Sequence, residues 1–201
     1  MISAQPNLDD ARHFANLAQI ASDGFYSHLL GSRADAILAS TFQHLNNDNS
    51  YELTNFLKVD NTIIGMLNGF TAKQKNRIGN QTEWLILKYG TWRFVRYLTI
   101  GIMFHAITDF IGKRLSDDDY YIQMVAIYPQ FRGMGHSKTI LQYAEYLALS
   151  QGCQGLVLDV DERNEIAINA YHKVGFEVVG ESNKIHIDGK PWGLFRMRKT
   201  L

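Results

Sequence analysis

The sequence predicts an α/β protein whose strands form one mixed sheet, as in the α+β class. Two observations indicate this fold class. A strand, helix, strand, helix series occupies residues 120–175, and hairpin patterns flank it at 51–70 and 176–200. Helical crossovers join parallel strands and hairpins join antiparallel strands, so both kinds of pairing are expected. The chain has 201 residues, 46% of them hydrophobic, which is enough to bury a core, and we expect one domain over residues 1–201.

Two helices are predicted before the first hairpin. Asp9 and Asp10 lie near the start of a segment with apolar residues at helical spacing, which predicts a helix over 8–22. A second pattern of this kind covers 34–45 and has one apolar face. The polar run Asn-Asn-Asp-Asn-Ser at 46–50 ends this second helix as a loop.

The first hairpin is indicated by its turn. Asp60 and Asn61 separate two runs rich in β-forming residues, 51–59 and 62–70. Asp and Asn tolerate the left-handed backbone that a two-residue hairpin turn requires. We therefore predict two antiparallel strands here.

Residues 72–119 interrupt the regular pattern and form an insert between the third and fourth strands. Its segment 82–115 is long and aromatic and predicts two helices that hinge near Gly90 or Gly101. The apolar run at 97–112 contains a histidine and an aspartate. It is too short and too polar to cross a bilayer, so no stable membrane insertion is expected.

After the insert the pattern is regular again. Gly152 and Gly175 follow amphipathic segments and suit the C-terminal caps of two helices. Asp188 and Gly189 form a hairpin signal near the end of the chain. The predicted elements are a strand at 120–128, a helix at 134–152, a strand at 155–160, a helix at 164–175, and strands at 176–182 and 191–200.

Composition argues against several classes of function. Twenty basic residues balance twenty acidic ones and the pI is about 7.1, which argues against a nucleic-acid-binding surface. Cys153 is the single cysteine, and we interpret it as a structural thiol. The lack of a disulfide, and a first segment that turns acidic without a basic and apolar leader, favour a cytoplasmic protein. The seven histidines show no ligand spacing, and Asp159, Asp161 and Glu162 suit solvated strand ends, so no metal is predicted.

The stretch Gln-Phe-Arg-Gly-Met-Gly-His-Ser at 130–137 suits an anion. Gly133 and Gly135 carry no Cβ, so an anion can approach the backbone where a helix begins and its first amides lack internal partners. Arg132 adds a forked cation for phosphate oxygens. The ending of a P-loop and the three-glycine dinucleotide fingerprint are both missing. The turn therefore suits a pyrophosphate but matches neither of these two nucleotide-binding motifs.

Two motifs in this region resemble the GNAT superfamily of N-acetyltransferases. Its acyl-CoA signature, Gln/Arg-x-x-Gly-x-Gly/Ala, is matched by Gln130, Arg132, Gly133 and Gly135. The run Asn-Glu-Ile-Ala-Ile-Asn-Ala-Tyr-His-Lys-Val-Gly-Phe at 164–176 matches the downstream motif of Asn, Ala, Tyr, a basic residue and Gly-Phe. The two motifs occur in the expected order within residues 120–182, and the first hairpin and the two leading helices also fit.

The resemblance implies a GNAT-like fold and direct transfer of the acetyl group of acetyl-CoA, as co-substrate, to a primary amine in a ternary complex. The strand residues whose backbone would pair with the pantetheine arm are Met124, Val125 and Ile127. The residues whose amides would hold the pyrophosphate are Arg132, Gly133, Met134, Gly135, His136 and Ser137. Asn164 matches a residue that often contacts the cofactor, and Tyr171 matches the tyrosine that commonly protonates the CoA thiolate.

Several of these residues have a simpler alternative role. Tyr171 can be a core aromatic, and Asn164 is already explained as a helix N-cap. His136 and Ser137 stand where the family usually has an aliphatic residue and a Gly or Ala. A serine still fits a helix N-terminus, whereas His136 can contact the cofactor, pack, or face solvent.

The sequence offers no evident general base for the amine. The strand position where some relatives have a glutamate carries Tyr121 and Gln123, and neither is a base at neutral pH. Asp119 and Glu83 could act through water, and the sequence does not choose between them. A non-catalytic acyl-CoA-binding or sensing module on the same fold is therefore the alternative function. A phosphate-binding module for another nucleotide is a third.

The aromatic insert has three candidate roles. It could form a wall of the acceptor site, or it could be added core or a homodimer contact, which aromatic residues also suit. It could also lie on a membrane surface through Arg93 and Arg96, which we rank last. Its aromatic residues are Trp84, Tyr89, Trp92, Phe94 and Tyr97. Polyamines, amino acids, antibiotics, protein N-termini and lysines all stay open as acceptors.

Overall fold

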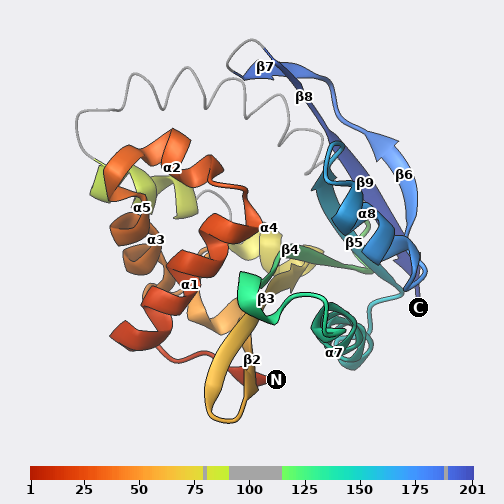
Figure 1. Cartoon of the computed structure of the whole chain (residues 1–201), viewed down its shortest axis with the longest axis horizontal. Helices are drawn as coiled ribbons and strands as arrows, with labels where there is room; N and C mark the ends of the chain where they lie inside the picture. The colour runs from red at the N-terminus through yellow and green to blue at the C-terminus, as the bar shows by residue number, and fades with distance from the viewer. Residues whose placement is uncertain (79–80, 91–114, 188–189) are drawn as a thin grey trace.

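The computed structural model describes residues 1–78, 81–90, 115–187 and 190–201 (Figure 1). Within these ranges a seven-stranded sheet has the order β1-β2-β3-β4-β5-β9-β6. Its strands are β1 (Ile2–Ser3), β2 (Thr54–Val59), β3 (Thr62–Thr71), β4 (Asp119–Ile127), β5 (Gly155–Asp161), β6 (Glu177–Glu181) and β9 (Leu194–Thr200). Strands β4 and β5 pair in parallel, and the other neighbours in this sheet pair antiparallel. The predicted mixed sheet is confirmed.

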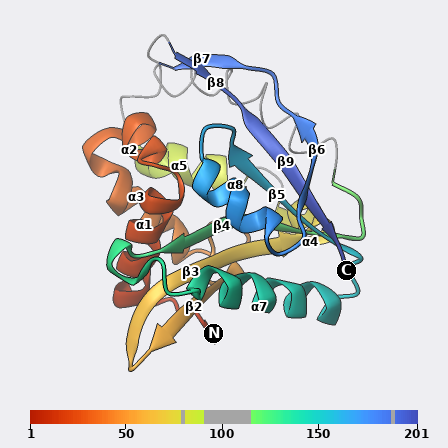
Figure 2. The same cartoon turned by 45° about the vertical axis from the view of Figure 1, so that its right-hand side comes forward.

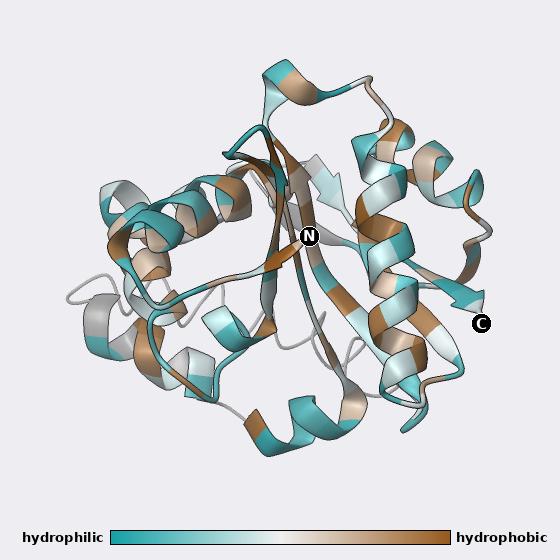
Figure 3. Ribbon diagram, turned by 90° about the horizontal axis from the view of Figure 1, so that it is seen from below, coloured by the Kyte–Doolittle hydropathy of each residue, from teal (hydrophilic) through white to brown (hydrophobic). Residues whose placement is uncertain are grey.

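Helices cover both faces of this sheet, which Figure 3 shows from below. The described helices are α1 (Leu8–Ala21), α2 (Phe25–Leu30), α3 (Ala34–Phe42), α4 (Ala72–Ile78), α5 (Gln81–Gly90), α7 (His136–Ser150) and α8 (Glu165–His172). Helices α7 and α8 pack on one face, and α1 and α3 pack on the other. The sheet is therefore the central layer of three.

The two faces hold separate apolar clusters because successive strand residues point to opposite sides. Under α7, Ile140 and Leu141 pack with Leu67 of β3 and Leu156 of β5, all of them buried. On the opposite face, Phe14 and Leu17 of α1 and Phe42 of α3 pack on Phe56 and Met66 of the first hairpin. The alternating pattern of β2 and β3 thus supplies both cores.

The two leading helices are present but end earlier than predicted. Helix α1 starts after Asn7, whose side chain accepts hydrogen bonds from the amides of Asp9 and Asp10, at 3.0 and 2.8 Å. Helix α3 stops at Phe42, where the predicted helix ran to residue 45. Beyond Phe42 the His44 amide and Asn47 Nδ2 both donate to the Thr41 carbonyl, at 3.1 and 3.0 Å, in place of the next α-helical hydrogen bond. The short helix α2 was not predicted.

The first hairpin has the predicted turn. Asp60 and Asn61 take φ values of 45° and 64°, the left-handed backbone of a two-residue hairpin turn. Strand β2 begins at Thr54 rather than at residue 51, because Tyr51–Leu53 forms a 3₁₀ turn. The register of β2 against β3 also shifts between Leu57 and Lys58.

Within the described residues, the predicted insert is helical over α4 and α5 but not over 115–119. Helix α5 covers the start of the predicted 82–115 segment and ends at Gly90, whereas α4 was not predicted. Trp84 is exposed. The side chain of Tyr89, the proposed hinge at Gly101, and Trp92, Arg93, Phe94, Arg96 and Tyr97 lie outside what the structure describes. Among the described helices, none has the length and apolarity needed to cross a membrane.

The predicted pairing of the C-terminal strands is present, but the predicted strand 191–200 is broken at Gly193 into two strands. Strand β6 pairs antiparallel with β9, which also pairs with β5. A two-stranded sheet of β7 (Ile185–Ile187) and β8 (Lys190–Trp192) projects beyond them (Figure 1). The hairpin signal at Asp188 and Gly189 lies outside the described residues.

Candidate functional site

The most open part of the sheet lies between β4 and β5. The two strands pair from Asp119↔Gly155 to Ile122↔Leu158 and then diverge (Figure 2). Beyond that point β4 continues to pair with β3, up to Gly65↔Ile127. Its other edge over residues 124–127 therefore has no strand partner in the described sheet. An extended ligand can pair with such an edge as an added strand would.

A β-bulge marks the point where the strands diverge. Asn68 of β3 pairs with Met124, but the next residue, Gly69, pairs with Ile122, so Gln123 is the extra residue. A bulge leaves one residue outside the ladder and re-aims its neighbours. Here Gln123 and Met124 follow each other on the side of the sheet that carries α1 and α3. Val125 and Ile127 lie on the other side, against the α7 cluster.

The loop after β4 leads into α7 through two left-handed glycines. Gly133 and Gly135 have φ values of 78° and 81°, and Gly135 is the N-cap of α7. No side chain among the described residues caps this helix. A Cβ at either glycine would have no heavy atom within 4 Å, so the space beside both glycines is open. The first-turn amides of a helix favour an anion. This geometry fits a pyrophosphate.

The other residues of the turn line its exposed rim. Arg132 donates from Nε to the Ile127 carbonyl at 3.2 Å, which anchors its guanidinium at the end of β4. Met134 is 64% exposed. His136 and Ser137 form the start of α7 and are partly exposed. The structure thus brings the predicted turn residues together at the end of the open strand edge, and their contact with a cofactor remains a prediction.

Tyr171 lies on α8, which follows β5, and Asn164 is the N-cap of this helix. Asn164 Oδ1 accepts from the amide of Ala167 at 3.1 Å, so its N-cap role is confirmed and its cofactor contact remains a prediction. The Tyr171 ring packs against Phe176, with ring centroids 5.8 Å apart, in the cluster that also contains Val125. Burial raises the pKa of Tyr171 to about 12. Both the core role and the acid role are compatible with this placement.

The candidate bases named from the sequence are already engaged or not described. Asp119 is buried at the start of β4, and its Oδ1 accepts from Arg198 Nη2 at 3.1 Å. The Tyr121 hydroxyl donates to Asp159 at 3.0 Å, and burial followed by the Asp159 charge raises its pKa well above the ordinary value. The Glu83 side chain lies outside the described part of the chain.

The strand-end carboxylates are not simply solvated, which corrects the prediction. Asp159 forms a buried ion pair with Arg196, whose Nε and Nη2 each donate to it at 2.9 Å. Asp161 accepts from Arg163 and from Trp192, and these bonds outweigh burial and lower its pKa. Glu162 pairs with Lys184 at 3.1 Å. Among the described residues no cluster of His, Cys, Asp and Glu suits a metal ion.

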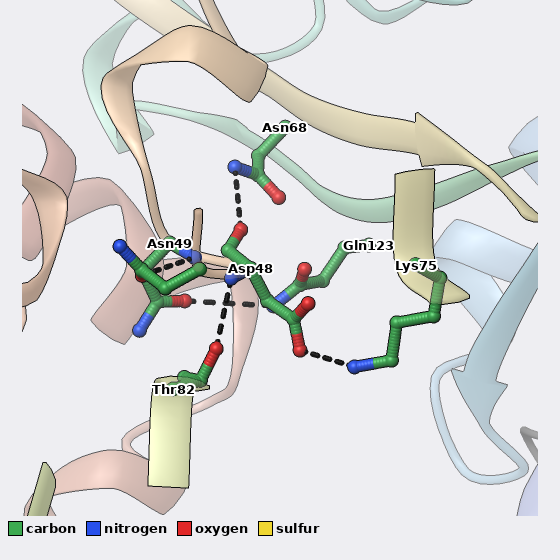
Figure 4. A network of polar contacts seen from close by, with 7 residues as sticks. Asp48, Asn49, Asn68, Lys75, Thr82 and Gln123 are labelled. Carbon is green, nitrogen blue, oxygen red and sulfur yellow. Dashed lines mark hydrogen bonds and ion pairs between the residues drawn. The ribbon is translucent and has the colours of Figure 1, made fainter. Parts of the chain in front are cut away.

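The sequence did not predict the buried polar network on the α1 and α3 side of the bulge (Figure 4). The loop at 46–50 was predicted as a simple end to a helix, yet four of its five residues, Asn47, Asp48, Asn49 and Ser50, are buried. They bond to neighbours on β3, β4, α4 and α5, which are Asn68, Gln123, Lys75 and Thr82. The polar composition signalled a loop. Its burial comes from these distant partners, which leave no local pattern.

The fold and the open edge define a class before any comparison. The molecule is a mixed α/β protein in which, within the described residues, a strand edge without a partner runs toward a helix N-terminus without a side-chain cap. A model of the acetyltransferase (GNAT) family matches residues 14–176. The chain belongs to this family, whose members transfer acyl groups from acetyl-CoA to amines, and the family resemblance expected from the motifs is confirmed.

Individual relatives agree with this assignment. The peptidyl-lysine N-acetyltransferase YjaB of Salmonella typhimurium is 34% identical over 77 residues, which are 38% of this chain and 49% of the relative. The match thus spans about half the length of that relative. Two solved structures share the fold: an N-acetyltransferase from Staphylococcus aureus, with a TM-score of 0.69, 20% identity and 98% of both chains covered, and another acetyltransferase, with a TM-score of 0.66, 22% identity and 98% and 97% covered.

Proposed function

We propose that this protein is an N-acetyltransferase that moves the acetyl group of acetyl-CoA to a primary amine by direct transfer in a ternary complex. One observation carries the proposal. The unpaired edge of β4 runs over residues 124–127 into an uncapped helix N-terminus at Gly135. In CoA an extended pantetheine arm is joined to a pyrophosphate. The arm would pair with the strand edge, and the pyrophosphate would bind at the helix N-terminus that follows it.

Each part of the site has a role in this proposal. The backbone of Met124, Val125 and Ile127 pairs with the pantetheine arm. The pyrophosphate lies on the turn from Arg132 to Ser137, where Met134 and His136 contribute their amides. Asn164 contacts the cofactor in addition to capping α8. A backbone N–H beside the bulge stabilises the oxyanion that forms when the amine attacks the thioester.

Tyr171 is the general acid in this scheme. The amine nitrogen forms a bond to the carbonyl carbon, the carbon–sulfur bond breaks, and the thiolate takes a proton from the phenol. The amine loses its protons to solvent or to a base, and the phenol is reprotonated from water. Because burial raises the pKa of Tyr171 to about 12, the phenol holds its proton at neutral pH and is available as a donor.

The alternative is an acyl-CoA-binding or sensing module without catalysis. One observation favours it: the carboxylate of Asp119 is held by Arg198 and the hydroxyl of Tyr121 by Asp159. Neither is free to take a proton from an amine.

The wider setting is proposed from the same features. We expect one domain with acetyl-CoA and an amine as its partners, no metal and no nucleic acid, and a cytoplasmic location. The 72–119 insert would line the acceptor side or form a homodimer contact.

Turnover decides between enzyme and sensor. CoA release from acetyl-CoA should be measured with a panel of amines, for the wild type and for Tyr171→Phe. Release that depends on the amine and drops in the variant supports the enzyme. Tight acetyl-CoA binding without release on any amine supports the sensor. Thermal protection by ATP or NAD but not by CoA would contradict both.

A further inference from the structure

Three buried oxygen atoms beside the β4 bulge have no hydrogen-bond partner among the described residues. They are Asp48 Oδ1, Asn68 Oδ1 and Gln123 Oε1. Asn68 is 0% exposed and Asp48 is 9% exposed. Buried acceptors are nearly always satisfied, because a buried acceptor without a donor has lost its hydrogen bonds to water without replacement. Three such atoms beside one another have acceptor capacity for a donor from outside the chain, either a ligand or an ordered water.

The surrounding network holds these oxygens in defined orientations. Asn68 donates from Nδ2 to the Asp48 carbonyl and to Thr54 Oγ1, both at 3.1 Å, so its amide orientation is set and Oδ1 is the remaining atom. Lys75 Nζ binds Asp48 Oδ2 at 2.5 Å, which leaves Oδ1 as the other carboxylate oxygen. The Asp48 amide donates to Thr82 Oγ1 at 2.8 Å. The site is therefore preorganised.

The three side chains lie together at the place where acyl transfer is proposed. Asn68 pairs with Met124 across the bulge, whose extra residue is Gln123. Gln123 Nε2 is 3.5 Å from Oδ1 of Asn49, the residue after Asp48. In Figure 4 the Asp48 carboxylate points toward the side chains of Gln123 and Lys75. The bulge is also where the unpaired edge of β4 begins, so the oxygens border the proposed acyl end of the site.

The chemistry of these atoms selects one kind of group. A primary ammonium has three N–H donors and a positive charge. The site has three acceptor oxygens, one of them on a carboxylate, and charge-assisted hydrogen bonds are the stronger kind. A neutral amide lacks the charge, and a quaternary ammonium lacks the donors.

We propose that Asp48, Asn68 and Gln123 bind the primary ammonium group of the acceptor, so that the acceptor is an amine that is cationic in solution. The inference rests on the proposed function, because it assigns this site to the acceptor. Asp48 offers its free carboxylate oxygen, Oδ1, beside the ion pair that Oδ2 makes with Lys75, and the two amide oxygens orient the ammonium beside the bulge.

The test measures binding by the full chain loaded with CoA, without turnover. Propylammonium chloride should raise the melting temperature in a concentration-dependent way, because a ligand that binds only the folded state stabilises it. Tetramethylammonium chloride and propionamide at the same concentrations should not. In Asp48→Asn the dissociation constant for propylammonium should rise about tenfold or more, since a charged hydrogen bond is lost.

Two further variants keep the test decisive. Asp117→Asn removes the same charge from an exposed position and should leave propylammonium binding unchanged. Gln123→Glu adds a carboxylate at the site and should tighten binding about threefold or more. If Asp48→Asn fails to fold, Gln123→Glu still decides the outcome.

Equal responses to propylammonium and to either control compound would overturn the proposal, as would an unchanged constant in Asp48→Asn or no tightening in Gln123→Glu. No response to propylammonium would also overturn it and would leave ordered water as the partner of these oxygens. The readout is independent of catalysis. Ammonium binding without acetyl transfer to any amine would contradict the proposed function. Acetyl transfer without ammonium binding would contradict this inference alone.

Discussion

The two sides of the β4 bulge are built on different principles. On the α7 side, the proposed acetyl-CoA site is made of backbone groups: an unpaired strand edge, two left-handed glycines and an uncapped helix N-terminus. On the α1 and α3 side, the proposed ammonium site is made of side chains from one loop and two strands. Backbone sites depend on local geometry, whereas side-chain sites depend on which distant residues meet.

This difference has a consequence for recognition. A pyrophosphate held by amides is recognised by any chain that keeps the turn, so the cofactor side can stay constant while the rest changes. The side-chain site can be altered residue by residue without disturbing that turn. Substitutions in the turn should therefore change the KM for acetyl-CoA, whereas substitutions in the side-chain site should change the KM for the amine.

The largest expected effect is on the chemical step. Tyr171→Phe should lower kcat by about 10²–10⁴-fold, the usual contribution of a general acid, with little change in acetyl-CoA binding. The measurement is steady-state CoA release together with calorimetric binding of acetyl-CoA. A kcat within a factor of two or so of the wild type would assign Tyr171 to the core alone.

The pH profile sharpens the same point. The protonated phenol is the active form, and its pKa is raised to about 12. Rates should therefore not fall through loss of this proton as the pH rises to about 10, the ordinary pKa of tyrosine. A decline that is centred below that value and disappears in Tyr171→Phe would contradict the assignment.

The ion pair that joins β5 to β9 should matter for stability rather than for either site. Asp159→Ala leaves the buried Arg196 guanidinium without its carboxylate, which costs about 3–5 kcal/mol of unfolding free energy. Arg163→Ala removes an exposed pair and should cost about 1 kcal/mol or less. Denaturant unfolding of both variants checks the contrast, and equal losses would refute it.

The turn can be tested with a matched pair of glycines. Gly135→Ala and Gly152→Ala both place a Cβ on a left-handed residue with no heavy atom within 4 Å. Each should lose about 1–2 kcal/mol of stability from backbone strain. Only Gly135→Ala should also raise the KM for acetyl-CoA, because only its Cβ would project into the anion site. A similar KM increase in both would assign the effect to stability.

The smallest effect separates two roles of Asn164. Asn164→Ala removes the cap on the Ala167 amide and should cost about 1 kcal/mol of stability. Asn164→Ser keeps a capping oxygen but lacks the amide group. If Asn164 also contacts the cofactor, serine should restore stability without restoring the KM for acetyl-CoA. Full recovery of both would leave the cap as its only role.

What the sequence predicts well follows from local rules. The Asp60-Asn61 turn, the glycine turn before α7 and the Asn164 cap each depend on a backbone conformation that a few residue types favour. Hydrophobic periodicity likewise predicts α1 and α7. These features are visible in one short window of sequence.

What the sequence could not reveal depends on tertiary contact. Asp159 is a strand-end carboxylate that becomes buried only because Arg196 lies opposite it, 37 positions away. Asp48 joins the site through Asn68 and Lys75, and Gln123 contacts the neighbouring Asn49. These three partners lie on three different elements. The bulge at Gln123 is set by pairing with β3. Neither the composition nor the spacing of residues within a short stretch of sequence predicts which distant side chains come into contact.

Amide hydrogen exchange on CoA binding tests the location of the site most directly. The amides of residues 124–127 that point away from β3, and the amides of 133–137, should become protected when CoA is added, because they gain partners on the pantetheine and the pyrophosphate. The α1 and α3 helices should change little. Protection that leaves 124–137 unaffected while other segments become protected would show that CoA binds elsewhere.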